Sequence, residues 1–261
     1  MGQNKKKFSL VLVKPSHYDD DGYVIQWFRS SMPANSLACL YGLAVECDKE
    51  KILGENTELE IHAFDEANTC INTKKIASLI ESADDGMLML VGVQSNQFPR
   101  ALDIAKPLRA RRIKVAVGGF HVSGVMSMLK EHDSYIQTAL DIGVSIFSGE
   151  AEGRLGHVLI DAVNDKLEPI YNFLDDLPNI ENVAMPLLPS ERIRLTAGST
   201  TSFDAGRGCP FTCSFCTIIN VQGQKSRQRS IESIENIIRD NVKQGLSSFF
   251  ISDDDFARNK N

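Results

Sequence analysis

The chain has 261 residues, which is enough for one large domain or two ordinary ones. Its composition, 43% hydrophobic and 24% charged, is typical of a globular protein and excludes an intrinsically disordered one. The formal net charge of −6, with a pI near 5.4, gives no electrostatic support for nucleic-acid binding. We therefore expect no nucleic-acid partner.

The amino-terminal residues do not fit a targeting signal. Lys5–Lys7 precede an apolar run, Phe8–Val13, that is shorter than the roughly 7–15 apolar residues of a signal peptide. Lys6 stands where a myristoylation signal needs Ser or Thr. No run approaches the ~20 apolar residues of a membrane span. We expect a cytoplasmic protein, in which cysteines serve as metal ligands or catalytic groups more often than as disulfides.

Short apolar runs alternate with amphipathic stretches from residue 1 to about residue 165. The runs predict five buried strands, at Phe8–Val13, Leu59–Phe64, Met87–Val93, Lys114–Val117 and Val144–Phe147. The stretches between them predict helices, marked by apolar residues at helical spacing: Leu37, Leu40, Tyr41, Ala44 and Val45, then Ile76, Leu79 and Ile80, then Ala101, Ile104, Ala105 and Leu108. Asn35 and Ser36 are candidate caps of the first helix. Alternating strands and helices imply right-handed crossovers and a parallel sheet covered on both faces. The predicted fold class is therefore α/β, a doubly wound, Rossmann-like parallel sheet of about five strands, which would bind ligands beyond the carboxyl ends of its strands.

The pattern changes after residue 165. Residues 166–200 contain Pro178, Pro186 and Pro189 and show little periodicity, so we expect a linker there. We therefore divide the chain into a first domain over residues 1–165, a linker over 166–200, and a second unit over 201–261.

The second unit predicts a strand, a cysteine-rich loop, a helix and another strand. The helix is expected over Ile231–Gln244, with Ser230 as a candidate cap and Gly245 as its end. The last strand is expected over Ser247–Ser252, followed by an acidic turn.

Three of the six cysteines, Cys209, Cys213 and Cys216, lie in the sequence CPFTCSFC. Thiolates are soft ligands that suit zinc, copper(I) and iron–sulfur clusters, and this spacing lets three sulfurs converge on one centre. No cysteine or histidine follows Cys216, so a nearby fourth ligand is missing. Three thiolates therefore favour a 4Fe–4S cluster with one iron open to a substrate or cofactor. A zinc loop and three merely buried thiols are the alternatives.

The sequence RGCPFTCSFC resembles the signature loop of the radical S-adenosylmethionine (SAM) enzymes. The resemblance implies that Cys209, Cys213 and Cys216 hold a 4Fe–4S cluster whose open iron binds SAM, and that Phe215 lies against the adenine. It also implies a (β/α)6 barrel beginning near residue 201. SDDDF, which includes Asp254, resembles the acidic turn near the SAM site of that family; a solvated turn is the alternative.

A second informative stretch is VAVGGFHVSG, in which two glycines directly follow a predicted strand. Glycines at this place let a ligand approach the backbone closely. Polar residues at Gln94–Asn96 and the sequence FSGEAEG follow two other predicted strands. The carboxyl ends of parallel strands meet at one edge, so these three loops predict a cofactor pocket.

GGFHVSG and SGEAEG resemble the cobalamin-binding domain that precedes the barrel in one radical SAM subfamily. The resemblance implies that the corrinoid or its nucleotide tail is surrounded by Ser95, Gly118, Gly119, Phe120, His121 and Ser123, with Glu150 close by. Gln94, beside Ser95, is a further candidate for cofactor binding. For His121, the alternative is an ordinary loop histidine. The Asp-x-His-x-x-Gly ligand motif of many cobalamin proteins is not matched around His17, so we expect no cobalt ligand from that loop. Cys39, Cys47 and Cys70 lack ligand spacing and are expected to be structural thiols.

The resemblance implies an enzyme that uses a 4Fe–4S cluster, SAM and cobalamin to transfer a methyl group, through a 5′-deoxyadenosyl radical, to an unactivated carbon or phosphorus. It implies a reductant such as flavodoxin or ferredoxin and leaves the substrate open. Two other functions stay open: a non-catalytic corrinoid-binding module, and a radical SAM protein that does not bind cobalamin. A full barrel needs several βα steps of ~30 residues each, so residues 201–261 would supply only its beginning. We expect the chain alone to be inactive.

Overall fold

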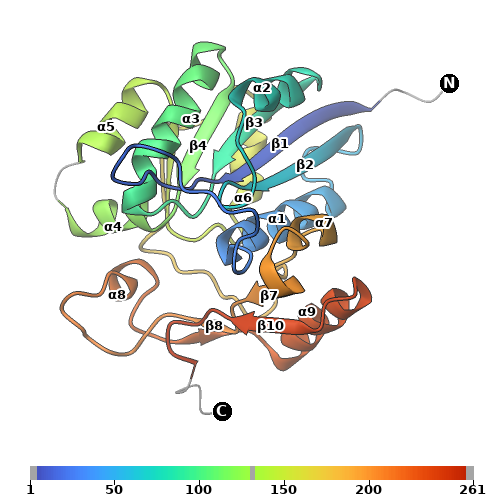
Figure 1. The fold of residues 1–261 in the computed structure, drawn as a ribbon, viewed down its shortest axis with the longest axis vertical. Helices are drawn as coiled ribbons and strands as arrows, with labels where there is room; N and C mark the ends of the chain where they lie inside the picture. Colours follow the sequence, from blue (N-terminus) through green and yellow to red (C-terminus); the bar gives the residue numbers. More distant parts are fainter. Residues whose placement is uncertain (1–4, 130–132, 257–261) are drawn as a thin grey trace.

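The structure is a computed structural model that describes residues 5–129 and 133–256. The first part of the chain forms a six-stranded parallel sheet with helices on both faces (Figure 1). The strands lie in the order β2-β1-β3-β4-β5-β6. They are β1 (Lys6–Lys14), β2 (Thr57–Asp65), β3 (Asp85–Leu90), β4 (Lys114–Gly118), β5 (Ser145–Ser148) and β6 (Ile170–Asn172).

Side-chain alternation along β1 shows how the sheet builds two cores. Val11 and Val13 face one side, where they meet α2 (Thr73–Glu81), α3 (Phe98–Ala110), α4 (Phe120–Met128) and α5 (Ser134–Asp141). Phe8, Leu10 and Leu12 face the other, where they meet α1 (Asn35–Lys49), α6 (Leu155–Val163) and the short α7 (Ser190–Ile193). Because both faces of the strand are covered, its residues are apolar without interruption from Leu10 to Val13. The doubly wound α/β fold and the places of all five predicted strands are confirmed.

The sheet has one strand more than the sequence predicted. β6 lies inside the segment expected to be a linker, and Ile170 pairs with Ile146 of β5. Three residues are too few to show a period of two, which is why the pattern did not reveal β6. The prediction that Asn35 and Ser36 cap α1 is also wrong: Ala34 is the N-cap, and Asn35 is the first helical residue.

The second unit is a βαβ element. β7 (Thr200–Phe203) and β10 (Ser248–Ile251) pair in parallel, and α9 (Ile231–Lys243) connects them. Ser230 caps α9, since its side chain accepts a hydrogen bond from the Ser233 N–H, and Gly245 follows the helix at a φ of 84°. These predictions are confirmed. Inside this element β8 (Gly206–Arg207) and β9 (Arg227–Gln228) form a two-stranded antiparallel ribbon, with α8 (Ile218–Val221) between them. Two 3-10 turns, η1 (Ser95–Gln97) and η2 (Ala197–Ser199), complete the elements of the described residues.

The second unit lies against the carboxyl edge of the sheet (Figure 1). Ser202 of β7 donates a hydrogen bond to the Pro33 carbonyl, and the Asn35 amide donates to Asp204 at 3.1 Å. Within residues 5–129 and 133–256 no helix has both the length and the hydropathy of a membrane span.

Candidate functional site

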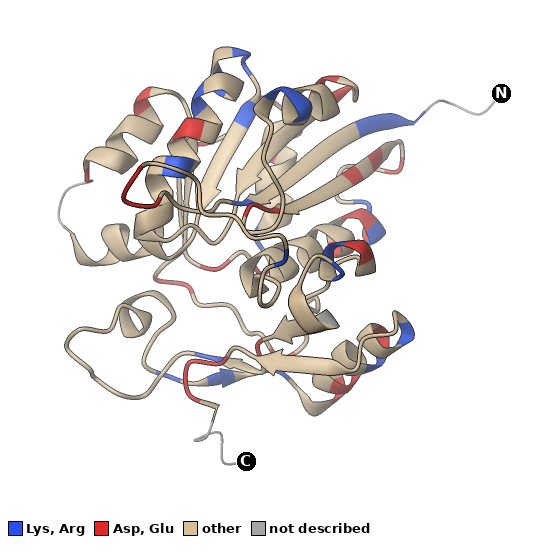
Figure 2. Cartoon of the chain, viewed as in Figure 1, with Lys and Arg blue, Asp and Glu red and all other residues tan. Residues whose placement is uncertain are grey.

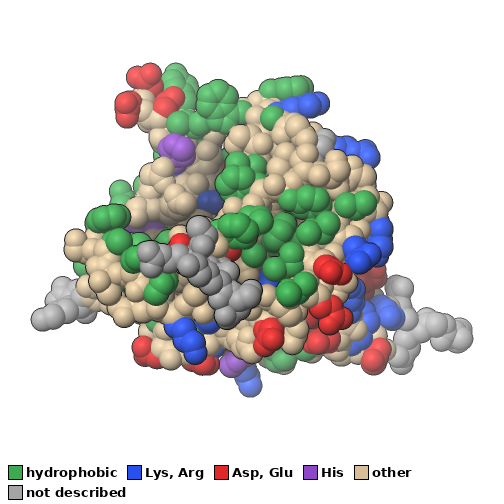
Figure 3. Space-filling view, turned by 90° about the horizontal axis from the view of Figure 1, so that it is seen from below, with side chains coloured by type: hydrophobic (Ala, Val, Ile, Leu, Met, Phe, Trp, Pro, Cys, Tyr) green, Lys and Arg blue, Asp and Glu red, His purple; other side chains and the backbone are tan. Residues whose placement is uncertain are grey.

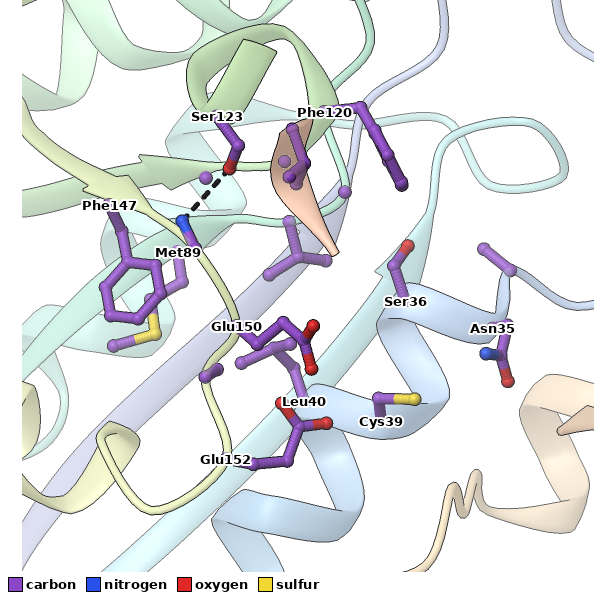
Figure 4. Close-up of a pocket in the computed structure, with 18 of the residues that line it drawn as sticks. Asn35, Ser36, Cys39, Leu40, Met89, Phe120, Ser123, Phe147, Glu150 and Glu152 are labelled. Atoms are coloured by element: carbon purple, nitrogen blue, oxygen red, sulfur yellow. Dashed lines mark hydrogen bonds between the residues drawn. The ribbon is translucent and has the colours of Figure 1, made fainter. Parts of the chain in front are cut away.

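A cavity of about 500 Å³ lies where the carboxyl ends of the strands meet the second unit (Figure 4). β1 and β3 are neighbours in the sheet, and their connections leave in opposite directions, which creates the crevice where doubly wound folds bind ligands. The cavity walls come from the ends of β3, β4 and β5, from α1, and from the second unit through Arg207, Gln222 and Asp254. Its size is in the range of small-molecule sites.

Most of the residues predicted around a corrinoid line this cavity. They are Gln94, Gly118, Gly119, Phe120, Ser123 and Glu150, together with Asp254 from the acidic turn. Ser95, His121 and Phe215 are not among its lining residues, and neither are the three cysteines of the loop.

Gly119 holds two of the wall loops together. Its φ is 143°, and a Cβ atom there would lie 2.1 Å from the Val93 nitrogen. The Val93 N–H donates to the Gly118 carbonyl at 3.0 Å, and the His121 N–H donates to the Val93 carbonyl at 3.1 Å. Only glycine permits this approach, so the double glycine fixes the loop after β4 against the loop after β3.

Ser123 joins the loop after β5 to this assembly. Its side chain is buried and accepts a hydrogen bond from the Gly149 N–H at 3.0 Å (Figure 4). Three loops that are distant in sequence therefore form one continuous wall.

His121 has protein partners on both sides of its ring. Nδ1 lies 3.1 Å from the Ser95 hydroxyl, Nε2 lies 3.0 Å from Asp133 Oδ2, and the ring centroid lies 4.6 Å from that of Phe98. Burial lowers the pKa of His121, and the nearby Asp133 carboxylate acts in the opposite direction. Ser95 and His121 thus form part of the support behind the wall.

The cysteine loop, residues 208–226, connects the two strands of the β8–β9 ribbon. Cys213 is exposed, Cys209 and Cys216 are half-buried, and all three are free thiols. Among the described residues, no three His, Cys, Asp or Glu side chains are grouped closely enough to hold a metal ion, so the three sulfurs do not converge in this conformation. Phe215 is 89% exposed.

Backbone contacts nevertheless brace the start of the loop. Gly208 has a φ of 84°, and a Cβ atom there would lie 2.5 Å from the Lys225 carbonyl oxygen. The Gly208 N–H donates to Asp254 at 3.2 Å, and the Ala205 N–H donates to Asp253 at 2.7 Å. Burial raises the pKa of both carboxyl groups, and these N–H donors act to lower it. The acidic turn therefore orders the chain just before the first cysteine of the loop.

A buried ionic network, which was not predicted from the sequence, connects the six-stranded sheet (the front sheet) to the β8–β9 ribbon at the base of the cysteine loop. Its cations are Arg207, Arg227 and Arg229, and its anions are Glu150, Glu152 and Asp204. Figure 2 shows acidic segments of the front loops opposite basic segments near β8. The alternation of Glu150 and Glu152, and the arginine two residues before Cys209, were signals in the sequence. The sequence alone could not show which of these residues pair, because Glu150 is 57 residues from Arg207 and 77 residues from Arg227.

Arg207 is the centre of this network. Its guanidinium lies 2.9 Å from Glu150, 2.7 Å from Glu152 and 2.9 Å from Asp204. Burial acts to lower the pKa of Arg207, but the Glu152 and Asp204 carboxylates outweigh it, so the pKa is raised well above its usual value. Arg207 is therefore a permanent cation in the cavity wall.

A second cavity, of about 730 Å³, adjoins the first. Lys14, Ala34, Asn35 and Ser252 line both. Figure 3 shows the molecule from below, with hydrophobic side chains gathered beside a hollow in this face. Asn35 Oδ1 is buried and has no hydrogen-bond partner among the described residues. A ligand that occupies both cavities would lie next to this oxygen, which could accept a hydrogen bond from it.

A comparison against known protein families found no match. The chain is 26% identical over 191 residues to a curated protein, the bacteriochlorophyllide d C-8(2)-methyltransferase of Chlorobaculum tepidum; the match covers 67% of this chain and 40% of that protein. The chain therefore spans less than half the length of this relative.

Two solved structures of one protein have a similar fold over 94% of the chain. Both are the radical SAM methyltransferase TsrM of Kitasatospora setae. One, with tryptophan and a SAM analogue bound, aligns with a TM-score of 0.59 at 13% identity and is covered over 47% of its length. The other, with cobalamin and a [4Fe-4S] cluster bound, aligns with a TM-score of 0.51 at 13% identity, with 49% of it covered. The chain thus shares the fold of about half of TsrM, a radical SAM methyltransferase whose solved structures hold cobalamin and a [4Fe-4S] cluster in one case and a SAM analogue in the other. It is also similar in sequence to a second methyltransferase, so the resemblance predicted from the cysteine and glycine loops is confirmed.

Proposed function

We propose that the chain forms the cofactor-binding portion of a radical SAM enzyme that uses a 4Fe–4S cluster, SAM and cobalamin to methylate an unactivated carbon or phosphorus centre. The observation that carries the proposal is that one cavity is lined both by the loops after β3, β4 and β5 and by Arg207, two residues before Cys209. A cofactor in the cavity and a cluster on the loop would therefore be neighbours.

The donor set of the loop suits an iron–sulfur cluster. The loop carries three free thiols, those of Cys209, Cys213 and Cys216. The hydrogen bond from the Gly208 N–H to Asp254 restricts the position of its first residues. Metal binding would bring the three sulfurs together, because metal binding and local folding are coupled. Phe215 is exposed and could therefore stack on the adenine of SAM. The proposal also includes Asp254 as a contact of the SAM site.

The cavity wall suits a corrinoid with its nucleotide tail. The two adjoining cavities give more room than the first alone, and the orphaned Asn35 Oδ1 offers an acceptor. In the proposal Gln94, Gly118, Gly119, Phe120 and Ser123 contact the corrinoid, and Ser95 and His121 shape the wall from behind. When bound, the cluster with SAM supplies one-electron chemistry and cobalamin supplies the methyl group. The chain's own residues hold, orient and desolvate these groups.

The finer parts of the proposal concern the whole protein. It divides the chain near residues 165 and 200 into a cobalamin-binding domain, a connecting segment that contributes β6, and the first βα steps of a barrel. It places the protein in the cytoplasm with a flavodoxin- or ferredoxin-type reductant and a small-molecule or peptide substrate.

Cofactor loading tests the proposal. The chain is reconstituted anaerobically with iron and sulfide, incubated with hydroxocobalamin, passed through gel filtration and analysed for iron, zinc and cobalt. We expect about four iron atoms and about one cobalt atom per chain. Corrinoid without iron would support the non-catalytic corrinoid module instead. Iron without cobalt would support a radical SAM protein that does not bind cobalamin.

A further inference from the structure

Arg207 and Arg227 occupy facing positions in the β8–β9 ribbon, where the two strands pair antiparallel. Like charges at facing positions of a strand pair repel one another and destabilise it. Both side chains are largely buried, at 11% and 14% exposed, so solvent screens this repulsion poorly. An anion placed against both guanidinium groups would therefore stabilise the ribbon.

Glu150 supplies that anion from the front sheet. Its carboxylate is 6% exposed and accepts hydrogen bonds from Arg207 Nη1 at 2.9 Å and from Arg227 Nη1 at 3.0 Å, and a further one from Arg227 Nη2. Figure 4 shows Glu150 extending from the loop after β5 into the cavity. One carboxylate thus contacts both strands at the base of the cysteine loop.

The two arginines depend on Glu150 to different degrees. Arg207 also pairs with Glu152 and Asp204, so it keeps two carboxylates when Glu150 is neutralised. Within the described part of the chain, Glu150 is the only carboxylate in an ion pair with Arg227, whose other acceptors are the Pro178 and Gln222 carbonyls. Neutralising Glu150 would leave Arg227 as a buried, unpaired cation, which is strongly destabilising.

From these contacts we infer that Glu150 is a positioning residue that fixes the cysteine loop to the cofactor cavity by pairing with both arginines of the β8–β9 ribbon. Residues 208–226 lie between the two paired positions, so the order of that loop depends on a residue of the front sheet. The cavity and the loop are then coupled: a change in the loop after β5 is passed to the base of the cysteine loop. The consequence for a bound cluster rests on the proposed function, whereas the order of the loop in the cofactor-free chain does not.

Backbone hydrogen exchange, read by mass spectrometry on the full cofactor-free chain, tests the inference. Glu150→Gln is expected to speed exchange in peptides over residues 205–228 by about tenfold or more, while peptides of β1 and β3 stay unchanged. Glu152→Gln is the matched control, because it removes an equally buried carboxylate that pairs with Arg207 alone. It is expected to have a several-fold smaller effect. Equal effects of the two variants, or no effect of Glu150→Gln, would overturn the inference.

The double variant Glu150→Gln with Arg227→Gln separates loss of position from loss of stability. It removes the unpaired cation, so exchange over residues 205–228 is expected to return to within about threefold of the wild type. If Glu150→Gln unfolds the chain, the double variant is still expected to fold, as judged by protection of β1 and β3. An unfolded double variant would contradict the inference.

Chelator challenge of the reconstituted chain extends the test to the cluster. Glu150→Gln is expected to lose iron several-fold faster than Glu152→Gln. A wild-type chain that takes up no iron and no corrinoid would contradict the proposed function, and the exchange measurement would still decide the role of Glu150.

Discussion

The ammonium group of Lys14 donates a hydrogen bond to the backbone carbonyl oxygen of Gly92, 2.7 Å away. This bond joins the carboxyl ends of β1 and β3, the neighbouring strands at which the connections of the sheet change direction. Lys14 is partly buried and lines both cavities. Burial lowers its pKa to about 8, and the Asp65 carboxylate acts in the opposite direction.

The lowered pKa predicts how stability depends on pH. Between pH 8 and about 10.4 the unfolded chain binds more protons at Lys14 than the folded chain, so the free energy of unfolding rises with pH. Lys14→Met removes this dependence. From pH 7.5 to 9.5 the wild type should gain roughly 1–2 kcal/mol relative to Lys14→Met in urea unfolding, after allowance for solvent screening. The exposed Lys75→Met is the control, and a difference between wild type and Lys14→Met that does not change with pH would contradict the prediction.

Local patterns were sufficient for the places of five strands, for the βαβ element and for the Ser230 cap, because each depends on residues close in sequence. The same patterns did not reveal β6, which is too short, or the true cap of α1. Asn35 has an ordinary capping side chain, but its amide donates to Asp204, which lies 169 residues away. The three predicted loops do line one cavity, and the binding of a cofactor there stays a prediction. The support role of His121 was not foreseen, because Ser95 and Asp133 are brought to its ring only by the fold.

The cysteine loop makes a direct prediction about iron. Anaerobically reconstituted Cys209→Ala, Cys213→Ala and Cys216→Ala should each retain little or no iron, because a cluster held by three thiolates has none to spare. Cys70→Ala is a matched control, since Cys70 is also a free thiol but lies outside the loop. Iron and sulfide assays give the result. Wild-type iron content in any of the three loop variants would show that the loop is not the ligand set.

Filling the cavity should separate corrinoid binding from cluster binding. Leu40 of α1 lines the cavity and is half-buried, so Leu40→Trp places an indole in the space proposed for the corrinoid without changing the loop after β5. We expect cobalt retention after gel filtration to fall at least about tenfold, with iron content unchanged. Ala110→Trp, at an exposed position at the end of α3, should retain wild-type cobalt. Full cobalt retention by Leu40→Trp would place the corrinoid elsewhere.

The ionic network should contribute to stability through Asp204. Its carboxylate is 3% exposed; burial acts to raise its pKa, but Arg207 and Arg229 outweigh it, and the pKa is lowered. Asp204→Asn leaves the buried Arg229 guanidinium without its carboxylate partner, whereas Arg207 keeps Glu150 and Glu152. The substitution should cost about 3–5 kcal/mol in urea unfolding at pH 7.

The exposed pair Asp240–Lys243 gives the control, in which Asp240→Asn should cost only about 0.2–1 kcal/mol. Because the Asp204 pKa is lowered, its contribution is complete above about pH 4 and declines as the pH falls further. Equal costs of the two substitutions at pH 7 would show that the buried network does not stabilise the fold.

The most direct test of the account is electron paramagnetic resonance of the doubly loaded chain. The cavity reaches Arg207, two residues from Cys209, so a reduced cluster and a cobalt(II) corrinoid would be close enough for their electron spins to interact. The spectrum of the chain carrying both should then differ from the sum of the spectra of chains carrying each alone. A spectrum equal to the sum, at full occupancy of both cofactors, would contradict the claim that the cavity and the cysteine loop form one site.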